Sequence, residues 1–151
     1  MRKLLSLLAL GLTVASLSGA PAFGAAQGTD RPFNGSGSGT GVLGSSADGT
    51  ENASHLGLAT FHADVVPTGP TTATTTTTLV AANGDTVTMS GPSTLVPVNA
   101  TTFTFTIVYT ITGGTGRFAD ASGAETTTGT GTVDSPTTFH VSFTFTGTIT
   151  Y

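Results

Sequence analysis

Glu125 and Tyr109 are the two side chains whose types and positions could support acid–base chemistry. Alternation in a threonine- and glycine-rich stretch puts Glu125 on one face with Thr127, Gly129, Gly131 and Val133. If that face points inward, its small side chains leave a cavity, and desolvation raises the pKa of a carboxyl toward the range useful for general acid catalysis. Tyr109 lies on the apolar face of its own segment and could present its hydroxyl to the same cavity. Both are therefore candidate catalytic residues, the alternatives being an exposed carboxylate and a tyrosine that bonds locally.

The stretch "ITGGTGRFADASG" (residues 111–123) contains a second candidate motif. Gly114, Gly116 and Ala119 match the dinucleotide pattern G-x-G-x-x-A, and an aspartate follows about twenty residues later. That fingerprint requires a helix after the glycines, and the glycine and threonines beyond residue 122 leave no room for one. The segment is better explained as a structural turn formed by Gly113, Gly114, Gly116, Arg117, Phe118 and Asp120. We expect positive φ at the three glycines, a buried Phe118, and an ion pair between Arg117 and Asp120.

Three histidines, His55, His62 and His140, are the remaining candidates for chemistry. A β-bulge near residue 59 or 60 would put the apolar residues of 56–65 on one face and move His55 and His62 off the core face, while His140 lies on the threonine face of the last strand. Metal sites usually need three or more converging ligands. We therefore expect no metal site and no cofactor.

Two segments of strict alternation must position these residues. In residues 102–112 and 138–151, aromatic and aliphatic side chains alternate with threonine, serine or histidine. One apolar and one polar face is typical of strands that pack on a core and meet water on the other side. The expected ligand-binding residues come from these apolar faces: Phe103, Phe105, Ile107, Tyr109, Phe143 and Phe145.

The rest of the chain also favours strands. Threonine and glycine are abundant, residues 71–80 read as a threonine-rich strand, and Asn83–Gly84 predicts a type I′ hairpin turn. Residues 44–52 read as a loop by composition. Seven or eight short strands without an amphipathic helix predict an all-β fold, an antiparallel up-and-down barrel of about eight strands, with a β-sandwich as the alternative. Barrel closure is favoured because it removes the open edge of the long aromatic strand.

The N-terminal residues predict export. Arg2 and Lys3 precede an apolar run and then small residues, as in a secretory signal peptide, here residues 1–26. We expect a flexible lead-in at 27–34 and one barrel domain at 35–151. Loss of the leader removes two positive charges from a chain of net charge −4, and no lysine would remain. Such an acidic protein is not expected to bind nucleic acid or an anionic membrane surface. No segment after the leader is long and apolar enough to predict membrane insertion.

Three segments carry a family resemblance: "SHLGLATF" (54–61), "AANGDTVT" (81–88) and "ITGGTGRFADASG" (111–123). In this order and spacing they resemble secreted bacterial proteins of the allene oxide cyclase barrel-like superfamily. Plant dirigent proteins are similar in their "GGTG" corner followed by an aromatic residue. The resemblance covers residues 33–151 and implies an eight-stranded antiparallel barrel with an apolar interior, often a trimer. Plant members cyclise an unsaturated epoxide derived from a fatty acid or steer the coupling of phenoxy radicals.

Three functions follow as hypotheses. The first is binding of a small hydrophobic molecule in the barrel interior, which requires an open pocket of ~300 Å³ or more. The second is a cofactor-free cyclase, isomerase or dirigent-like activity that uses Glu125 and Tyr109. The third is a structural or surface-interaction role with a filled core. An eight-stranded barrel is at the border between a filled core and a cavity for one small ligand, so the number of strands does not choose among these functions.

Overall fold

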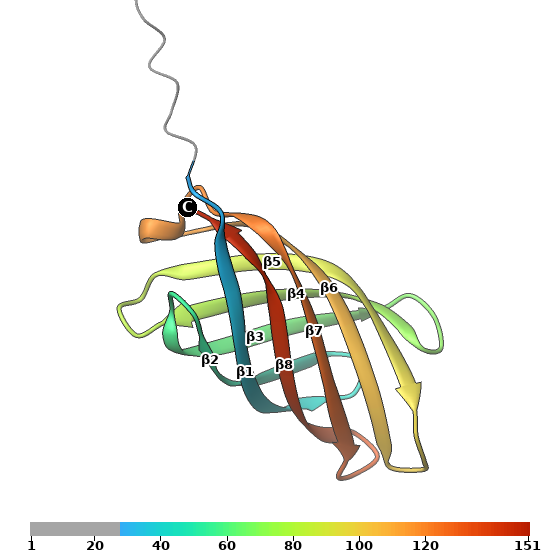
Figure 1. The fold of residues 1–151 in the computed structure, drawn as a ribbon. Coiled ribbons are helices and arrows are strands. Elements are labelled where there is room, and N and C mark those ends of the chain that lie inside the picture. The colour runs from blue at the N-terminus through green and yellow to red at the C-terminus, as the bar shows by residue number, and fades with distance from the viewer. Residues whose placement is uncertain (1–27) are drawn as a thin grey trace, which may run out of the picture.

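The computed structural model describes residues 28–151, and these residues form a closed antiparallel β-barrel (Figure 1). Each strand pairs with the next in sequence, and β8 pairs with β1 to close the barrel. The predicted up-and-down barrel is confirmed, and the sandwich alternative is wrong. The expected signal peptide, residues 1–26, lies outside the described residues. The strands are β1 (Arg31–Val42), β2 (Ser46–Ala53), β3 (Gly57–Pro67), β4 (Thr72–Ala81), β5 (Thr86–Pro97), β6 (Thr102–Gly114), β7 (Ser122–Val133) and β8 (Thr138–Thr150), with a 3₁₀ turn η1 (Gly116–Phe118) between β6 and β7.

The two ends of the barrel differ. One end carries η1, the β2–β3 and β4–β5 turns, and both ends of the described chain (Figure 1). Large side chains fill this end and are almost fully buried, namely Phe33, Leu56, Val87, Phe118 and Ile149. The opposite end carries the other four hairpin turns. We call these the closed end and the open end.

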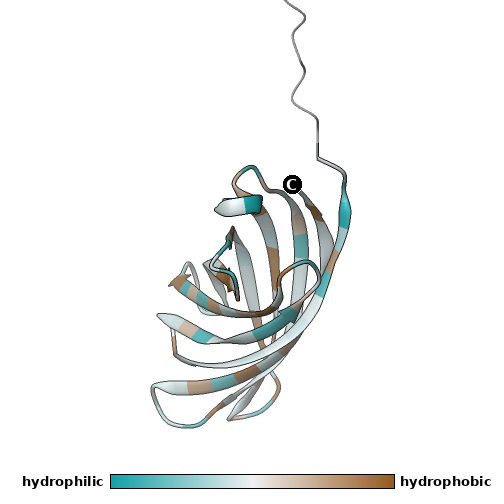
Figure 2. Cartoon of the chain, turned by 90° about the vertical axis from the view of Figure 1, so that its left-hand side faces the viewer, coloured by the Kyte–Doolittle hydropathy of each residue, from teal (hydrophilic) through white to brown (hydrophobic). Residues whose placement is uncertain are grey.

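Side chains alternate between the interior and water along the two aromatic strands. Phe103, Tyr109 and Ile111 of β6 are buried, whereas the threonines between them are exposed. β8 follows the same pattern, with Phe139, Val141, Phe145 and Ile149 buried. Much of each ribbon has intermediate hydropathy, with hydrophobic bands between paler stretches (Figure 2). The outward positions of β6 and β8 are mostly threonine, which suits both a pleated strand and contact with water.

The interior phenylalanines lie over glycines of the neighbouring strands. Phe145, Phe143 and Phe139 of β8 are paired with Gly35, Gly37 and Gly41 of β1, respectively. A Cβ added to any of these three glycines would meet the paired ring. The same arrangement joins Phe61 to Gly49, Phe105 to Gly129 and Phe103 to Gly131. Each ring thus occupies the space that a side chain on the next strand would need, an arrangement that offsets the weak strand propensity of glycine.

Two segments belong to strands where the sequence predicted otherwise. Most of residues 44–52, expected to be a loop, lies in β2 (Ser46–Ala53), which pairs with both β1 and β3. β1 begins at Arg31 rather than near residue 35, and Phe33, placed in the flexible lead-in, is fully buried. Composition was misleading in both cases, because pairing on two sides stabilises strands that are rich in Gly, Ser and Asp.

The expected β-bulge in 56–65 is wrong. Ala59, Phe61 and Ala63 face inward with an unbroken register, and Leu58 is 68% exposed. Leu56 is buried because it lies in the β2–β3 turn at the closed end, where His55 has a φ of 72°. The turn, and not a bulge, explains why the apolar residues of 56–65 do not keep a single two-residue alternation. A register shift does occur at Thr88/Met89, between β5 and β6.

The β4–β5 hairpin lies where Asn83–Gly84 predicted it, but the turn type differs. Gly84 has a φ of 87°, whereas Asn83 is not among the residues with positive φ. The carbonyl of Ala81 accepts from the backbone N–H of Gly84, and its own N–H donates to the carbonyl of Asp85. This is a three-residue loop with glycine in the left-handed position.

Residues 111–123 form a structural corner as predicted, but the φ of Gly114 and the partner of Arg117 differ from the prediction. Gly113 and Gly116 have positive φ, but Gly114 does not, and Phe118 is fully buried as expected. Arg117 does not pair with Asp120. Its Nε lies 3.9 Å from Oδ2 of Asp85, and its guanidinium donates to the carbonyl of His55. Arg117 therefore links the corner to the β4–β5 and β2–β3 turns. Within residues 28–151, no helix has the length and apolarity needed to cross a membrane.

The phenylalanine–glycine pairing predicts a specific stability coupling. Gly131→Ala should lower the free energy of unfolding by about 1–3 kcal/mol, because the nearest atoms to the new methyl group belong to the Phe103 ring. In a Phe103→Leu background the same change should cost less than half as much. Urea unfolding of the four proteins of this double-mutant cycle measures the coupling. Thr130→Ala, at an exposed position on the same strand, is the control. If Gly131→Ala costs the same free energy of unfolding in the wild-type and Phe103→Leu backgrounds, the pairing is contradicted.

Candidate functional site

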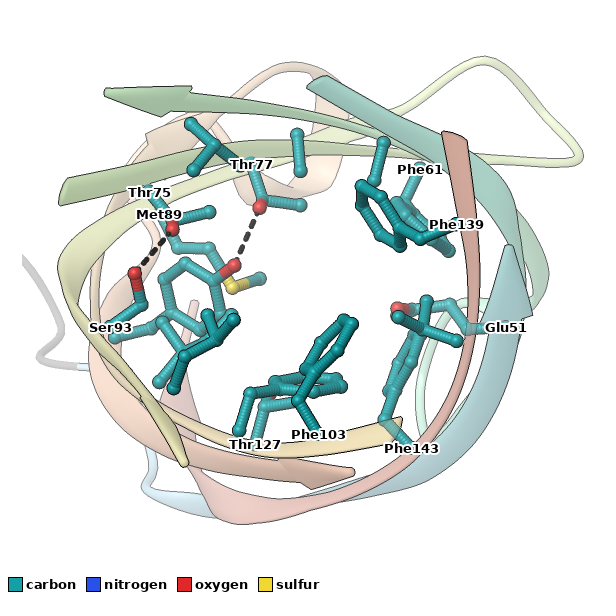
Figure 3. A pocket seen from close by; sticks show the side chains of 18 of the residues that line it. Glu51, Phe61, Thr75, Thr77, Met89, Ser93, Phe103, Thr127, Phe139 and Phe143 are labelled. Carbon is teal, nitrogen blue, oxygen red and sulfur yellow. Dashed lines mark hydrogen bonds between the residues drawn. The ribbon is translucent and has the colours of Figure 1, made fainter. Parts of the chain in front are cut away.

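The barrel encloses a cavity of about 150 Å³ that reaches the open end. Its lining includes Val42 and Leu43 beside the β1–β2 turn, which are 46% and 39% exposed. Inside, most of the lining is aromatic or aliphatic (Figure 3). The interior is therefore neither filled nor as large as the ~300 Å³ expected for a typical ligand pocket.

Five of the six expected ligand-binding residues line this cavity: Phe103, Phe105, Ile107, Tyr109 and Phe143. Phe145 does not. Its ring packs on Phe33, with 5.3 Å between the ring centroids, and fills the interior on the side of the closed end. Phe145 thus belongs to the packed core that supports the cavity.

Hydroxyl groups from β4, β5 and β6 form one wall of the cavity. Tyr109 Oη and Thr77 Oγ1 are 2.7 Å apart, and either can be the donor. Thr75 donates to the Ser93 hydroxyl at 3.0 Å. The Tyr109 hydroxyl therefore forms a hydrogen bond with a neighbouring strand, which is one of the two alternatives that the sequence left open. Burial raises the pKa of Tyr109 above its ordinary value.

Glu125 faces the interior from β7 and is 5% exposed. Its Oε1 accepts a hydrogen bond of 2.8 Å from Thr127, but its Oε2 is buried without a partner. The inward face of this part of β7 is the one that alternation indicated.

Glu51 is a second interior carboxyl that the sequence analysis missed. It projects from β2, is 6% exposed, and its Oε1 has no hydrogen-bond partner. Figure 3 shows it across the cavity from Thr75, Thr77 and Ser93. It was overlooked because residues 44–52 were read as a loop. A signal was available: Ala47, Gly49, Glu51 and Ala53 alternate with polar residues, and Glu51 and Glu125 are the only glutamates in the chain.

Burial governs the titration of these two carboxyls, which we call the carboxyl pair. Desolvation raises the pKa of Glu125 to about 7, partly offset by the Thr127 hydrogen bond. Desolvation, together with a smaller effect of the charge of Glu125, raises the pKa of Glu51 to about 8. The charge of an ionised Glu125 opposes ionisation of Glu51. Near neutral pH the pair holds at least one proton for much of the time.

The histidines lie away from the cavity. His62 Nδ1 is 2.6 Å from Asp48 Oδ1, and His140 Nδ1 is 2.8 Å from Asp134 Oδ1, all on the outer surface. His55 Nε2 is 2.9 Å from the carbonyl of Pro32 in the closed end. Across residues 28–151, no three His, Asp or Glu side chains gather as metal ligands would.

A scan against protein-family models and searches of curated proteins and solved structures found no match. The resemblance to the allene oxide cyclase barrel-like superfamily, and the trimer it implies, therefore stay predictions. The geometry of the cavity is the basis for the functional argument.

The carboxyl pair predicts that stability falls as pH rises. Both groups have folded-state pKa values above the ordinary value of 4.5, so the unfolded chain ionises at lower pH than the folded chain. Their contribution is complete below about pH 4.5 and is lost as pH rises to about 8, by at most ~1.4 kcal/mol per pH unit for each group. Urea unfolding from pH 5 to 9 measures this slope.

Glu51→Gln and Glu125→Gln should each flatten the slope, because a glutamine does not titrate. Asp120→Asn, at an exposed position in the 111–123 corner, is the matched control and should leave the slope between pH 5 and 8 unchanged. A wild-type stability that rises over that range would contradict the assignment.

Proposed function

We propose that the protein is an exported barrel that binds one small, predominantly apolar molecule in its interior. The observation that carries this proposal is the cavity of about 150 Å³, walled by phenylalanines and reaching the open end. Export rests on the charged and apolar pattern of the first 26 residues.

The cavity volume narrows the class of ligand. Apolar protein cavities of about 150 Å³ accept molecules the size of benzene. A single-ring compound or a short branched hydrocarbon fits this space, whereas a long acyl chain exceeds it. Edge-to-face contacts of the kind made by Phe61 and Phe143, with centroids 5.5 Å apart, favour an aromatic ligand.

Filling the cavity should abolish binding of a small aromatic probe. Ala63 is 7% exposed and lines the cavity, so Ala63→Leu places three additional carbon atoms in the space that the ligand would occupy. We expect toluene to bind wild-type protein saturably and to bind the variant at least about tenfold more weakly, as measured by ligand-observed NMR.

Val66→Leu is the matched control for this experiment, because Val66 is an exposed residue on the same strand. It adds a methylene outside the barrel and should leave toluene binding unchanged. Absence of saturable toluene binding to wild-type protein would contradict the proposal and favour the structural role with a closed interior.

A second candidate function is cofactor-free proton-transfer chemistry, as in an isomerase or cyclase. It is favoured by the buried Oε2 of Glu125, which has no partner, and by the pKa of about 7 at this carboxyl. A carboxylate with a pKa near the working pH can take a proton from an apolar substrate and return it at another position. This role requires a substrate small enough for the same cavity.

Cyclohexanone tests this second function directly. If Glu125 is a general base, its carboxylate should remove an α-proton to give the enolate, exchange that proton for a deuteron from D₂O and return the deuteron to carbon, so that NMR shows accelerated exchange at pD 7–8. Glu125→Gln should lose the acceleration and still bind cyclohexanone, whereas Asp48→Asn should keep both. Equal exchange rates for wild type and Glu125→Gln would exclude the role of Glu125 as the base.

A further inference from the structure

The carboxyl pair has almost no partners within the protein. No hydrogen bond joins the Glu51 carboxyl to another described residue, and the Glu125 carboxyl accepts only the one from Thr127. Buried polar atoms are normally satisfied, because an unpaired group costs about 1–3 kcal/mol. Two unpartnered carboxyl oxygens on a ligand-sized cavity therefore indicate where the polar part of a ligand would bind.

No positive side chain of residues 28–151 faces this cavity. Arg31 and Arg117 are the only basic residues in that range besides histidine. The Arg31 guanidinium lies 4.5 Å from the Tyr151 ring centroid and donates to its hydroxyl, and Arg117 joins Asp85 and His55 at the closed end. An ionised carboxylate in the interior thus has no counter-charge from the protein, and such an uncompensated buried charge is costly.

The distribution of acids strengthens this point. All six aspartates of the chain are at surface positions or in turns, as is usual for that residue, whereas both glutamates are interior. Both glutamate carboxyls therefore belong to a cavity whose other lining residues are apolar or carry a hydroxyl group.

On these grounds we infer that the preferred ligand is a small primary amine in its protonated form, with the ammonium between Glu51 and Glu125 and the hydrocarbon part against Phe61, Phe103 and Phe143. An ammonium group has three N–H donors. In the inferred complex two of them would donate to the unpartnered carboxyl oxygens, and the third would be free for a hydroxyl of the cavity wall, which Thr77 and Tyr109 also line. This inference rests on the proposed binding function and names its ligand class.

Charge also predicts how the affinity depends on pH. The interior titratable groups are Glu51 on β2, Glu125 on β7 and Tyr109 on β6, and the facing residues of β1, β3 and β8 are glycine, alanine, valine, phenylalanine and isoleucine. A bound ammonium favours ionised carboxylates, so protons compete with it at low pH. Affinity for the amine should therefore rise from pH 6 to pH 8 and fall again once the amine itself loses its proton.

Three probes of nearly equal size separate the possibilities: benzylamine, benzyl alcohol and toluene. At pH 8, titration calorimetry should show benzylamine binding about tenfold or more tightly than benzyl alcohol, since hydrogen bonds to charged groups contribute about 1.5–3 kcal/mol. The preference should shrink to less than about threefold in Glu51→Gln/Glu125→Gln and persist in Asp48→Asn.

A wild-type measurement makes the test independent of whether the variants fold. With only two glutamates in the chain, ¹³C labelling of their side-chain carboxyls gives two NMR signals. Benzylamine should move both signals toward the ionised position at pH 7, and toluene should not. If benzylamine and toluene bind equally well and neither signal moves, the amine assignment is wrong and the apolar binding site stands. If none of the three probes binds, both proposals are wrong.

Discussion

The packing of phenylalanine rings over glycines of the neighbouring strand is the constraint on which the rest of this structure depends. β1 has Gly35, Gly37, Gly39 and Gly41 along its inner face, and the rings of β8 and β3 occupy the space above them. Glycine alone is a weak strand former, and large inward side chains on every strand would overfill an eight-stranded barrel. Packing each ring over a glycine of the next strand avoids both effects. The ring covers the glycine backbone and occupies the space that a side chain at that position would otherwise fill.

The same constraint explains why a cavity and two carboxyls exist at all. Wherever glycines line the wall, the neighbouring side chain can extend across them, and this holds for the glutamates as well as for the rings. A Cβ on Gly37 would lie 2.8 Å from that of Glu51, and a Cβ on Gly147 would lie 2.7 Å from that of Glu125. The glutamates are thus held against bare backbone and directed into an interior with few hydrogen-bond donors, which raises their pKa values.

The best-packed part of the core and the entrance to the cavity lie at opposite ends of the barrel. The closed end concentrates the most completely buried side chains, including Phe33, Phe118 and Ile149, and Arg117 ties three of its connections together. The open end is rimmed by short hairpins and half-exposed apolar residues. Costly unpaired carboxyls in the middle are tolerated because the closed end provides well-packed apolar contacts.

The sequence by itself determined the strand class, the inward face of β6 and β8 and the turn at residues 113–116. Each follows from period-two alternation or from a glycine with positive φ, both of which are local properties. Tertiary structure alone decided that Phe145 packs on Phe33 away from the cavity, that Arg117 meets Asp85, and that Glu51 joins Glu125 in the interior. These outcomes depend on pairing and closure between residues far apart in the chain, and local composition carries little information about such partners.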